Sequence, residues 1–271
     1  MFLVNGRLSD RSFKKWKYFS GFIKSMLKKF SKIMAQTKED ANRFSHFSKT
    51  KVIYTGNIKY STPALKVDNE LLDKLKTITK KYVLVAASTH EGEDHIILDA
   101  YQEICKKIGQ NYISLIIIPR HPIRALKIYE LASQNYKVCI RSKLSDSIND
   151  VICVDSFGEM GTFFSIADFV FIGGSLVRVG GHNIFEPILF QKPVMYGPHM
   201  FNFREMKDLL EQSNVGFQVM NASDIAELFC KYISNEKFHN KTLTHLTKLK
   251  QEDPMKNVIS CLHEFGELFS C

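Results

Sequence analysis

The stretch FVFIGGSLVRVGGHNIFEP, residues 169–187, joins a short apolar run to a polar loop that contains two glycine pairs. Its first four residues are apolar at every position, which is typical of a strand that is covered on both faces of a sheet. We expect a helix at 183–191, and the apolar run PVMYG at 193–197 as the next strand. A strand, a loop, a helix and a further strand form the repeating unit of a parallel α/β sheet.

The same alternation runs through most of the chain. Further strands are expected at 32–36, 52–57, 83–88, 114–120, 137–142 and 151–156. Helices are expected at 38–47, 69–80, 92–108 and 158–167, in the segment ending at Ala132, and over most of the chain from Phe203 onward. Strands that are apolar throughout and alternate with helices indicate a buried parallel sheet. The predicted fold class is therefore α/β, doubly wound.

The composition is that of a globular protein with a substantial core. Of the 271 residues, 45% are hydrophobic and 24% are charged, which are ordinary values for folded domains. No apolar run approaches the roughly 20 residues of a membrane-spanning helix, and the opening MFLVN becomes polar too soon for a signal peptide. The six cysteines show no CxxC spacing, so we expect no zinc site, no disulfide framework and a reduced, cytosolic chain.

The net charge of +9 is concentrated near the N-terminus, where nine lysines and arginines stand between Met1 and Lys32 against one acid, Asp10. Apolar and aromatic residues recur at helical spacing from Phe13 to Phe30, which predicts one basic amphipathic helix. Three interpretations are open: a packed helix with a solvated basic face, a contact with an anionic membrane surface, and nucleic-acid binding. The sequence contains no recognisable nucleic-acid module, so no nucleic-acid partner is expected.

Polar clusters follow four of the predicted strands, at the point where each strand ends. They are STHEGE at 88–93, PRHP at 119–122, DSFGEMG at 155–161 and GGSLVRVGGHNIFEP at 173–187. Because the carboxyl ends of parallel strands lie at one edge of a sheet, where helix N-termini also point, we expect a ligand-binding crevice there.

Three features of these clusters have both a structural and a functional interpretation. Arg120 is either a surface charge or an anion ligand, held stiffly between two prolines. Glu186 is either an acid that suits a helix start or an acceptor for a ribose diol. Gly180 and Gly181 would let the backbone approach a phosphate closely.

No metal and no other cofactor is expected. His90 and His95 are five residues apart and do not share a helix face, while Glu91, Glu93 and Asp94 suit a helix start. The sequence also contains no Asp-x-Asp pair of the kind that holds a metal-bound diphosphate.

AASTHEGED (86–94), IIIPRHP (116–122), DSFGEMG (155–161) and the long motif at 173–203 together resemble the lipopolysaccharide Kdo transferases. These enzymes transfer 3-deoxy-D-manno-octulosonic acid (Kdo) from CMP-Kdo to the lipid A precursor. The segments LVNGRLSDRS, MAQTKEDANRF and VIYTGNIKY resemble the second half of the family's N-terminal domain, so the resemblance covers essentially the whole chain.

The resemblance implies a GT-B architecture, in which two Rossmann-like domains bind acceptor and donor. Residues 1–62 would be the C-terminal half of the acceptor-side domain, 63–252 the CMP-Kdo-binding domain and 253–271 a C-terminal helix. Family members carry a long segment before LVNGRLS, with a hydrophobic anchor and a catalytic glutamate in a stretch like ESELWPN. We therefore expect an N-terminally truncated member, with no catalytic residue to assign.

The resemblance also implies the donor site. Arg120 would bind the phosphate, with Pro119 shaping the turn. A helix opening at Gly158, Glu159 and Met160 would meet the nucleotide, as would the segment from Asn183 to Glu186, with Glu186 on the ribose. The implied substrate-binding residues are Pro119, Arg120, Phe157, Gly158, Glu159, Met160, Asn183, Ile184, Phe185 and Glu186.

Two functions remain open. The chain is either a glycosyltransferase that moves Kdo to lipid IVA, as a fragment or as half of a split enzyme, or a donor-binding remnant without catalysis. The expected partners are CMP-Kdo, the lipid A precursor, an anionic membrane surface and, for a split enzyme, a separately encoded N-terminal half. The expected location is peripheral, at the cytoplasmic face of the bacterial inner membrane.

Overall fold

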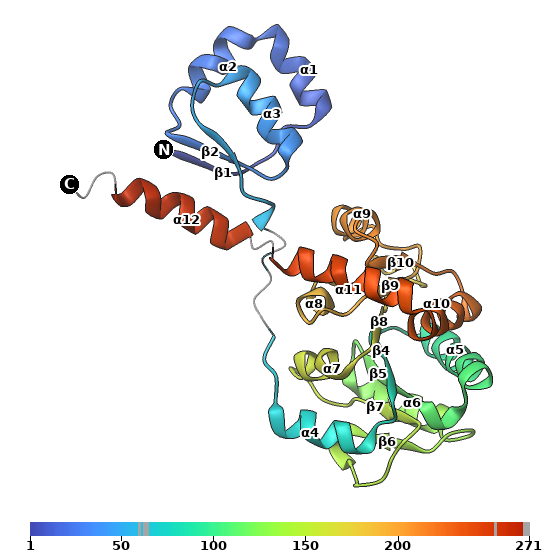
Figure 1. Ribbon diagram of the computed structural model, residues 1–271. Coiled ribbons are helices and arrows are strands. Elements are labelled where there is room, and N and C mark those ends of the chain that lie inside the picture. Colours follow the sequence, from blue (N-terminus) through green and yellow to red (C-terminus); the bar gives the residue numbers. More distant parts are fainter. Residues whose placement is uncertain (59–60, 62–64, 252–253, 268–271) are drawn as a thin grey trace. The chain divides into compact units, whose positions relative to one another are not determined.

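The computed structural model describes residues 1–58, 61, 65–251 and 254–267 (Figure 1). The chain forms two compact units, one of Met1–Pro63 with Gln251–Cys271 and one of Ala64–Lys250. The division into functional domains at 62 and 252 stays a prediction. None of the helices in the described ranges combines the length and the apolarity that a bilayer crossing requires.

The first unit is built on a three-stranded parallel sheet in the order β1-β2-β3. Its strands are β1 (Phe2–Gly6), β2 (Lys32–Ala35) and β3 (Val52–Tyr54). The last two were predicted, whereas β1 was not, because its apolar run is very short. The helix α3 (Lys38–Phe47) joins β2 to β3, as expected. The helix α12 (Pro254–Glu267) belongs to the same unit, where the Lys32 ammonium donates to the Cys261 carbonyl (2.9 Å).

The prediction of one helix across the basic segment is wrong. The segment forms α1 (Asp10–Tyr18) and α2 (Ser20–Leu27), separated at Phe19, whose φ of −114° and ψ of 31° are not helical. A straight helix over the whole segment would be about 27 Å long, whereas a strand of five residues spans only about 17 Å. The break therefore lets both halves pack on the same small core, which includes the buried Ile23 and Leu27.

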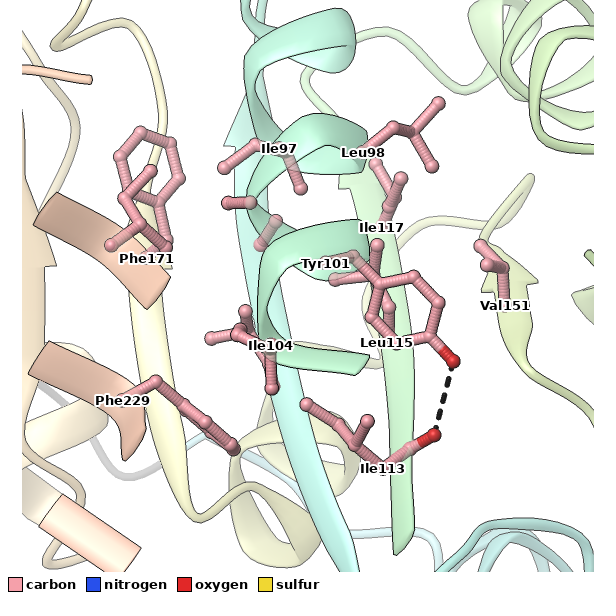
Figure 2. Packing of buried hydrophobic residues seen from close by; sticks show 14 of the residues in the cluster. Ile97, Leu98, Tyr101, Ile104, Ile113, Leu115, Ile117, Val151, Phe171 and Phe229 are labelled. Atoms are coloured by element: carbon pink, nitrogen blue, oxygen red, sulfur yellow. Dashed lines mark hydrogen bonds between the residues drawn. The ribbon is translucent and has the colours of Figure 1, made fainter. Parts of the chain in front are cut away.

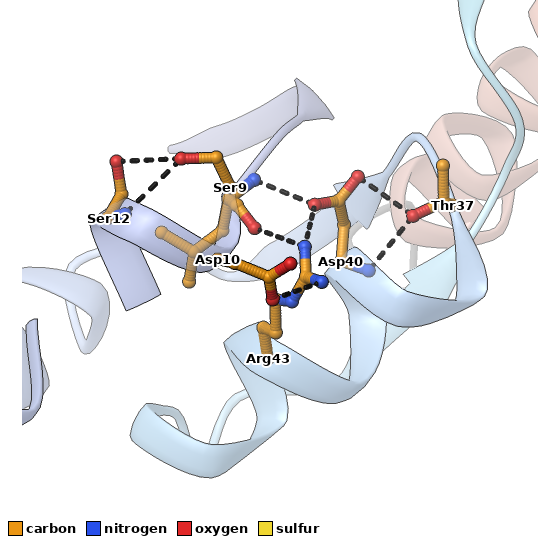
Figure 3. Close-up of polar contacts among 7 residues, drawn as sticks. Ser9, Asp10, Ser12, Thr37, Asp40 and Arg43 are labelled. Carbon is orange, nitrogen blue, oxygen red and sulfur yellow. Dashed lines mark hydrogen bonds and ion pairs between the residues drawn. The ribbon is translucent and has the colours of Figure 1, made fainter. Parts of the chain in front are cut away.

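A buried carboxylate ties the loop after β1 to the start of α3 (Figure 3). Asp40 accepts hydrogen bonds from the Leu8 amide (2.8 Å) and the Thr37 hydroxyl (2.9 Å). Arg43 donates to the Leu8 carbonyl (2.8 Å) and to Asp10 (2.7 Å). Because Asp40 is only 4% exposed and fully bonded, its charge is compensated within the fold.

The second unit contains a seven-stranded parallel sheet in the order β10-β9-β8-β4-β5-β7-β6. The strands are β4 (Tyr82–Thr89), β5 (Ile113–Pro119), β6 (Val138–Ile140), β7 (Val151–Cys153), β8 (Phe169–Ile172), β9 (Val194–Tyr196) and β10 (Gly216–Gln218). The α-helices are α4 (Asn69–Ile78), α5 (Glu93–Ile108), α6 (Ala125–Ala132), α7 (Met160–Ile166), α8 (Glu186–Leu189), α9 (Arg204–Gln212), α10 (Ala222–Ser234) and α11 (Glu236–Gln251). Short 3₁₀ helices are η2 (Gln110–Tyr112), η3 (Pro122–Arg124) and η4 (Arg141–Lys143). This arrangement confirms the predicted α/β fold class with a parallel sheet.

Helices cover both faces of this sheet. On one face α5 packs against the central strands and α10, with Ile97, Ile104 and Phe229 in the shared core (Figure 2). The hydroxyl of Tyr101, which is also buried there, donates to the Ile113 carbonyl (3.0 Å). On the other face α7 contributes the fully buried Phe163 and packs against α4. Two covered faces explain why the central strands are apolar at every position.

One local prediction in this unit is wrong, and one strand was not predicted. The helix expected at 183–191 shrinks to the four residues of α8, since the Asn183 side chain accepts from the Phe185 amide (3.0 Å) and competes with helix formation. Helices α9, α10, α11 and α12 cover most of the described chain after Phe203, as expected, but the strand β10, which pairs with β9 and extends the sheet, was not predicted. A three-residue edge strand between two helices carries little periodic signal.

Candidate functional site

The four polar clusters follow strands that are neighbours in the sheet, in the order β8-β4-β5-β7. Pro119 ends β5, Thr89 ends β4, and the two other clusters begin after β7 and β8. All four strands are parallel, so their carboxyl ends lie at one edge of the sheet. The structure thus gathers the clusters at the edge where the sequence placed a crevice.

A pocket lies at this edge, and six of the ten predicted site residues line it. They are Pro119, Arg120, Phe157, Gly158, Glu159 and Met160. Ser88, Ile118, Val154, Ser156 and Phe163 complete the lining. The other four predicted residues, Asn183–Glu186, do not line this pocket.

Arg120 contributes a cation to the lining of the pocket. Its backbone amide donates to the Thr89 carbonyl (3.0 Å), which fixes the chain directly after β5, while its side chain is exposed. Among the residues that the structure describes, no carboxylate pairs with its guanidinium. Two neighbouring arginines are occupied, since Arg124 pairs with Asp94 and Arg141 pairs with Glu159 (2.6 Å). Arg120 is therefore available to an anion from outside the fold.

The segment before α7 forms the opposite wall of the pocket. Gly158 has a φ of 82°, a conformation that favours glycine, and the neighbouring Phe157 ring is 75% exposed. The Glu159 carboxylate accepts from Arg141 and from the Ser156 hydroxyl, so its charge is already compensated. The pocket consequently keeps the positive charge of Arg120 and an exposed aromatic ring.

Sequence reasoning missed the role of Glu93. This residue does lie in the first turn of α5, as expected, but its fully buried carboxylate binds two chain segments. One oxygen accepts from the amides of His90 (2.9 Å) and Gly174 (2.7 Å), and the other from those of Ser175 (3.0 Å) and Leu176 (2.9 Å). Glu93 thus anchors the glycine-rich loop to the end of β4. One acid among several at a helix start gives no signal for such a long-range contact.

The second glycine pair has a structural reason within the chain. Gly180 and Gly181 have φ of 106° and 76°, and both amides donate to the Gly174 carbonyl (3.1 and 2.8 Å). A Cβ on Gly180 would lie 2.3 Å from the Asn202 side chain, and one on Gly181 would lie 2.2 Å from the Met200 sulfur. These positions require glycine for backbone conformation and packing. Their contact with a phosphate stays a prediction.

The loop ends in a polar pair, Asn183 and Glu186, that is partly exposed. The Asn183 amide donates to the Glu186 carboxylate (3.1 Å). Burial raises the pKa of Glu186 above its usual range, against the effect of this hydrogen bond. Ile184 and Phe185 are 0% and 3% exposed, so any ligand contact of theirs is through backbone atoms. In the described part of the chain, no three His, Cys, Asp or Glu side chains gather as a metal site requires.

Sequence comparison identifies related proteins. Residues 1–62 match the family model described as 3-deoxy-D-manno-octulosonic-acid transferase (kdotransferase). The 3-deoxy-D-manno-octulosonic acid transferase of Rickettsia felis is 37% identical over 232 residues, which cover 83% of this chain and 49% of that protein. The chain spans about half the length of the curated relatives it matches.

Solved structures agree with the sequence matches. The C-terminal CMP-Kdo binding domain of WaaA from Acinetobacter baumannii is 26% identical, with a TM-score of 0.60 over 68% of this chain and 95% of that domain. UDP-GlcNAc 2-epimerase from Neisseria meningitidis shares the fold, with 17% identity and a TM-score of 0.55 over 97% of this chain and 69% of that one. These matches confirm the predicted α/β fold of the GT-B type, with parallel sheets. Over most of its length the chain is thus similar to the Kdo transferases, glycosyltransferases of the GT-B type.

Proposed function

We propose that this chain binds CMP-Kdo and serves the transfer of Kdo to the lipid A precursor. The observation that carries the proposal is the guanidinium of Arg120, which pairs with no carboxylate among the described residues. It lies in a pocket lined by Phe157–Met160 at the carboxyl edge of the sheet. The related domain from Acinetobacter baumannii, named for CMP-Kdo binding, supports the same ligand. In this proposal Arg120 binds the single phosphate, and Glu186 accepts hydrogen bonds from the ribose.

Arg120 would also stabilise the transition state. As the bond between Kdo and the phosphate oxygen breaks, negative charge grows on the departing CMP and the sugar gains oxocarbenium character. A preorganised cation at that phosphate stabilises the transition state by roughly several kcal/mol where water is excluded. A base has to accept the proton of the acceptor hydroxyl, and no residue of this chain is assigned that role.

Donor binding is tested by calorimetry with CMP, in buffer with and without EDTA. We expect CMP to bind equally in both, because one phosphate can be neutralised by Arg120 and the sequence has no Asp-x-Asp pair for a metal-bound diphosphate. Binding that requires a divalent metal, or no binding of CMP, would contradict the proposed site.

We also propose an anionic membrane surface at the cytoplasmic face of the inner membrane as a partner of α1 and α2. Tyr18, Phe19 and Phe22 are 86%, 69% and 72% exposed, although the remaining apolar side chains of these helices pack inward. Exposed aromatic rings among lysines are typical of helices that bind in the interface of anionic bilayers.

Liposome flotation tests the membrane contact. Changing the exposed residues Lys14, Lys15, Lys28 and Lys29 to glutamine should weaken binding to anionic vesicles, and added salt should weaken it further. Lys106 and Lys107, exposed at the end of α5, provide the charge-matched control pair for two of these changes. Binding that responds to neither salt nor the four changes would return α1 and α2 to packed helices with a solvated face.

A further inference from the structure

Two histidines from different polar clusters face each other at the same sheet edge. His90 follows β4, and His182 lies in the glycine-rich loop after β8. Their Nε2 atoms are 2.8 Å apart, and the rings are almost parallel, with an interplanar angle of 8° and centroids 5.1 Å apart. At this distance one Nε2 must carry a proton and the other must accept it, so the accepting ring holds its own proton on Nδ1.

The fold holds this pair in place. Glu93 accepts from the amides of both His90 and Gly174, which fixes the two segments relative to each other. Gly174 has a φ of 66°, and a Cβ there would lie 3.2 Å from ring atoms of both His90 and His182. A glycine under two imidazoles and a buried carboxylate between their segments make the pair a built feature of the unit.

The surroundings of the pair are mainly cationic. His121 lies with its ring centroid 6.4 Å from that of His90, and the positive charges of Arg120 and Arg124 also act on His90. Burial, together with the charges of His90, Arg120 and His121, lowers the pKa of His182 to about 4. Burial likewise lowers the pKa of His90, against the effect of Glu93, so the surroundings favour the neutral form of both rings.

The acids near the pair are already bonded. Glu93 is held by four backbone amides, and Asp94 pairs with Arg124. In the described part of the chain, neither imidazole Nδ1 has a protein partner. The edge therefore presents an uncompensated cation, Arg120, beside imidazoles whose Nδ1 positions are open to a ligand.

We propose that His90 and His182, with His121, form the subsite for the carboxylate of the sugar acid, beside the phosphate at Arg120. This inference rests on the proposed donor binding. In a nucleotide-activated 2-keto sugar acid, the carbon that bears the phosphate oxygen also bears the carboxylate, so the two anions must bind side by side. A carboxylate here accepts from an imidazole Nδ1–H and favours proton uptake by the pair, because an opposite charge stabilises the imidazolium.

The test compares Kdo with its methyl ester, both added to the chain saturated with CMP. Calorimetry should show Kdo binding about ten- to a hundredfold tighter than the ester, the range expected for a charge-assisted hydrogen bond. Imidazole ¹⁵N resonances of His90 and His182 should shift with Kdo and stay unchanged with the ester. Equal affinities for Kdo and the ester, or unshifted resonances, would overturn the subsite.

Variants separate this subsite from the nucleotide site. His182→Asn should lose the preference for Kdo over the ester and keep CMP affinity within about twofold, because the carboxylate contact is absent in CMP. His95→Asn, on the exposed face of α5, is the matched control and should keep the preference. Full discrimination by His182→Asn would contradict the inference. Wild-type chain that fails to bind CMP would refute the donor site itself, which is a different result.

Discussion

At the scale of single residues, the Glu93 carboxylate determines how the glycine-rich loop is held. Its four backbone donors leave no oxygen to spare, and a glutamine would present an NH₂ group to two amides that need an acceptor. We expect Glu93→Gln to destabilise the second unit by about 2–4 kcal/mol, the cost of leaving buried donors unsatisfied. Urea unfolding followed by circular dichroism measures this loss.

The control for that experiment is Glu91→Gln, since Glu91 is exposed and pairs only with Lys127. Its effect should be small, because exposed ion pairs contribute little. Trp16 is the only tryptophan and lies in the first unit, so the unfolding midpoint from its fluorescence should not move in either variant. An unchanged second unit in Glu93→Gln would contradict the role of this carboxylate.

The Glu186 carboxylate should lower the stability of the fold at neutral pH while it strengthens nucleoside binding. Because burial raises its pKa, the ionised carboxylate costs stability above that pKa, and the cost disappears as the pH falls below the value in the unfolded chain. We therefore expect Glu186→Gln to melt higher than wild type at pH 7 and equally at pH 3. The same variant should bind CMP and cytidine more weakly by the same factor, since the ribose is common to both. If Glu186→Gln melts at a lower temperature than wild type at pH 7, the expected direction of the effect is wrong.

At the scale of elements, the long apolar strands were predictable because their residues are apolar and buried along almost the whole length. The expected helix 38–47 is present with the same bounds as α3, and the strand expected at 83–88 lies within β4. The length of α8 and the presence of β10 were not predicted. α8 is limited by the Asn183 side chain, and β10 exists only because β9 offers a pairing edge. A strand such as β10 depends on a pairing partner that no local window contains.

Of the candidate site, the sequence predicted the polar clusters and their common edge of the sheet, but not the contacts between them. The motif PRHP directly after a strand located Arg120, which the structure places in the pocket with Phe157–Met160. The pairing of His90 with His182 could not be read from the sequence, because 92 positions separate them. In the sequence, His95 was the histidine considered as a partner of His90. The sheet instead brings the ends of β4 and β8 together, and with them His90 and His182.

Two helical glycines should respond to alanine in opposite ways. A Cβ on Gly161 in α7 would lie 2.3 Å from the Lys66 carbonyl oxygen, whereas a Cβ on Gly21 in α2 would meet nothing within 4 Å. We expect Gly161→Ala to destabilise by about 1–3 kcal/mol through overpacking. Gly21→Ala should stabilise by about 0.5–1 kcal/mol, because alanine favours the helix. Thermal unfolding of both variants measures the difference, and equal signs would contradict the packing around α7.

At the scale of the whole molecule, about half of the relatives' length is represented in this chain. The proposed donor binding depends on the second unit, and the chain matches 95% of a solved domain that is named for CMP-Kdo binding. We expect the 271-residue polypeptide to bind CMP through this unit, and an assay of Kdo transfer to a lipid A precursor tests separately whether it supplies the base. Turnover of CMP-Kdo onto a lipid A precursor by this polypeptide alone would show that a base lies within it.

The most direct test of the central claim is the effect of Arg120→Ala on the binding of CMP and cytidine. Removal of a charge-assisted contact should weaken CMP binding by about 1.5–3 kcal/mol and leave cytidine, which has no phosphate, almost unaffected. Lys107→Ala, an exposed cation in the last turn of α5, provides the control and should change neither affinity. Calorimetry of the three proteins gives the comparison. Equal losses for CMP and cytidine in Arg120→Ala would remove this arginine from the phosphate and contradict the proposed donor site.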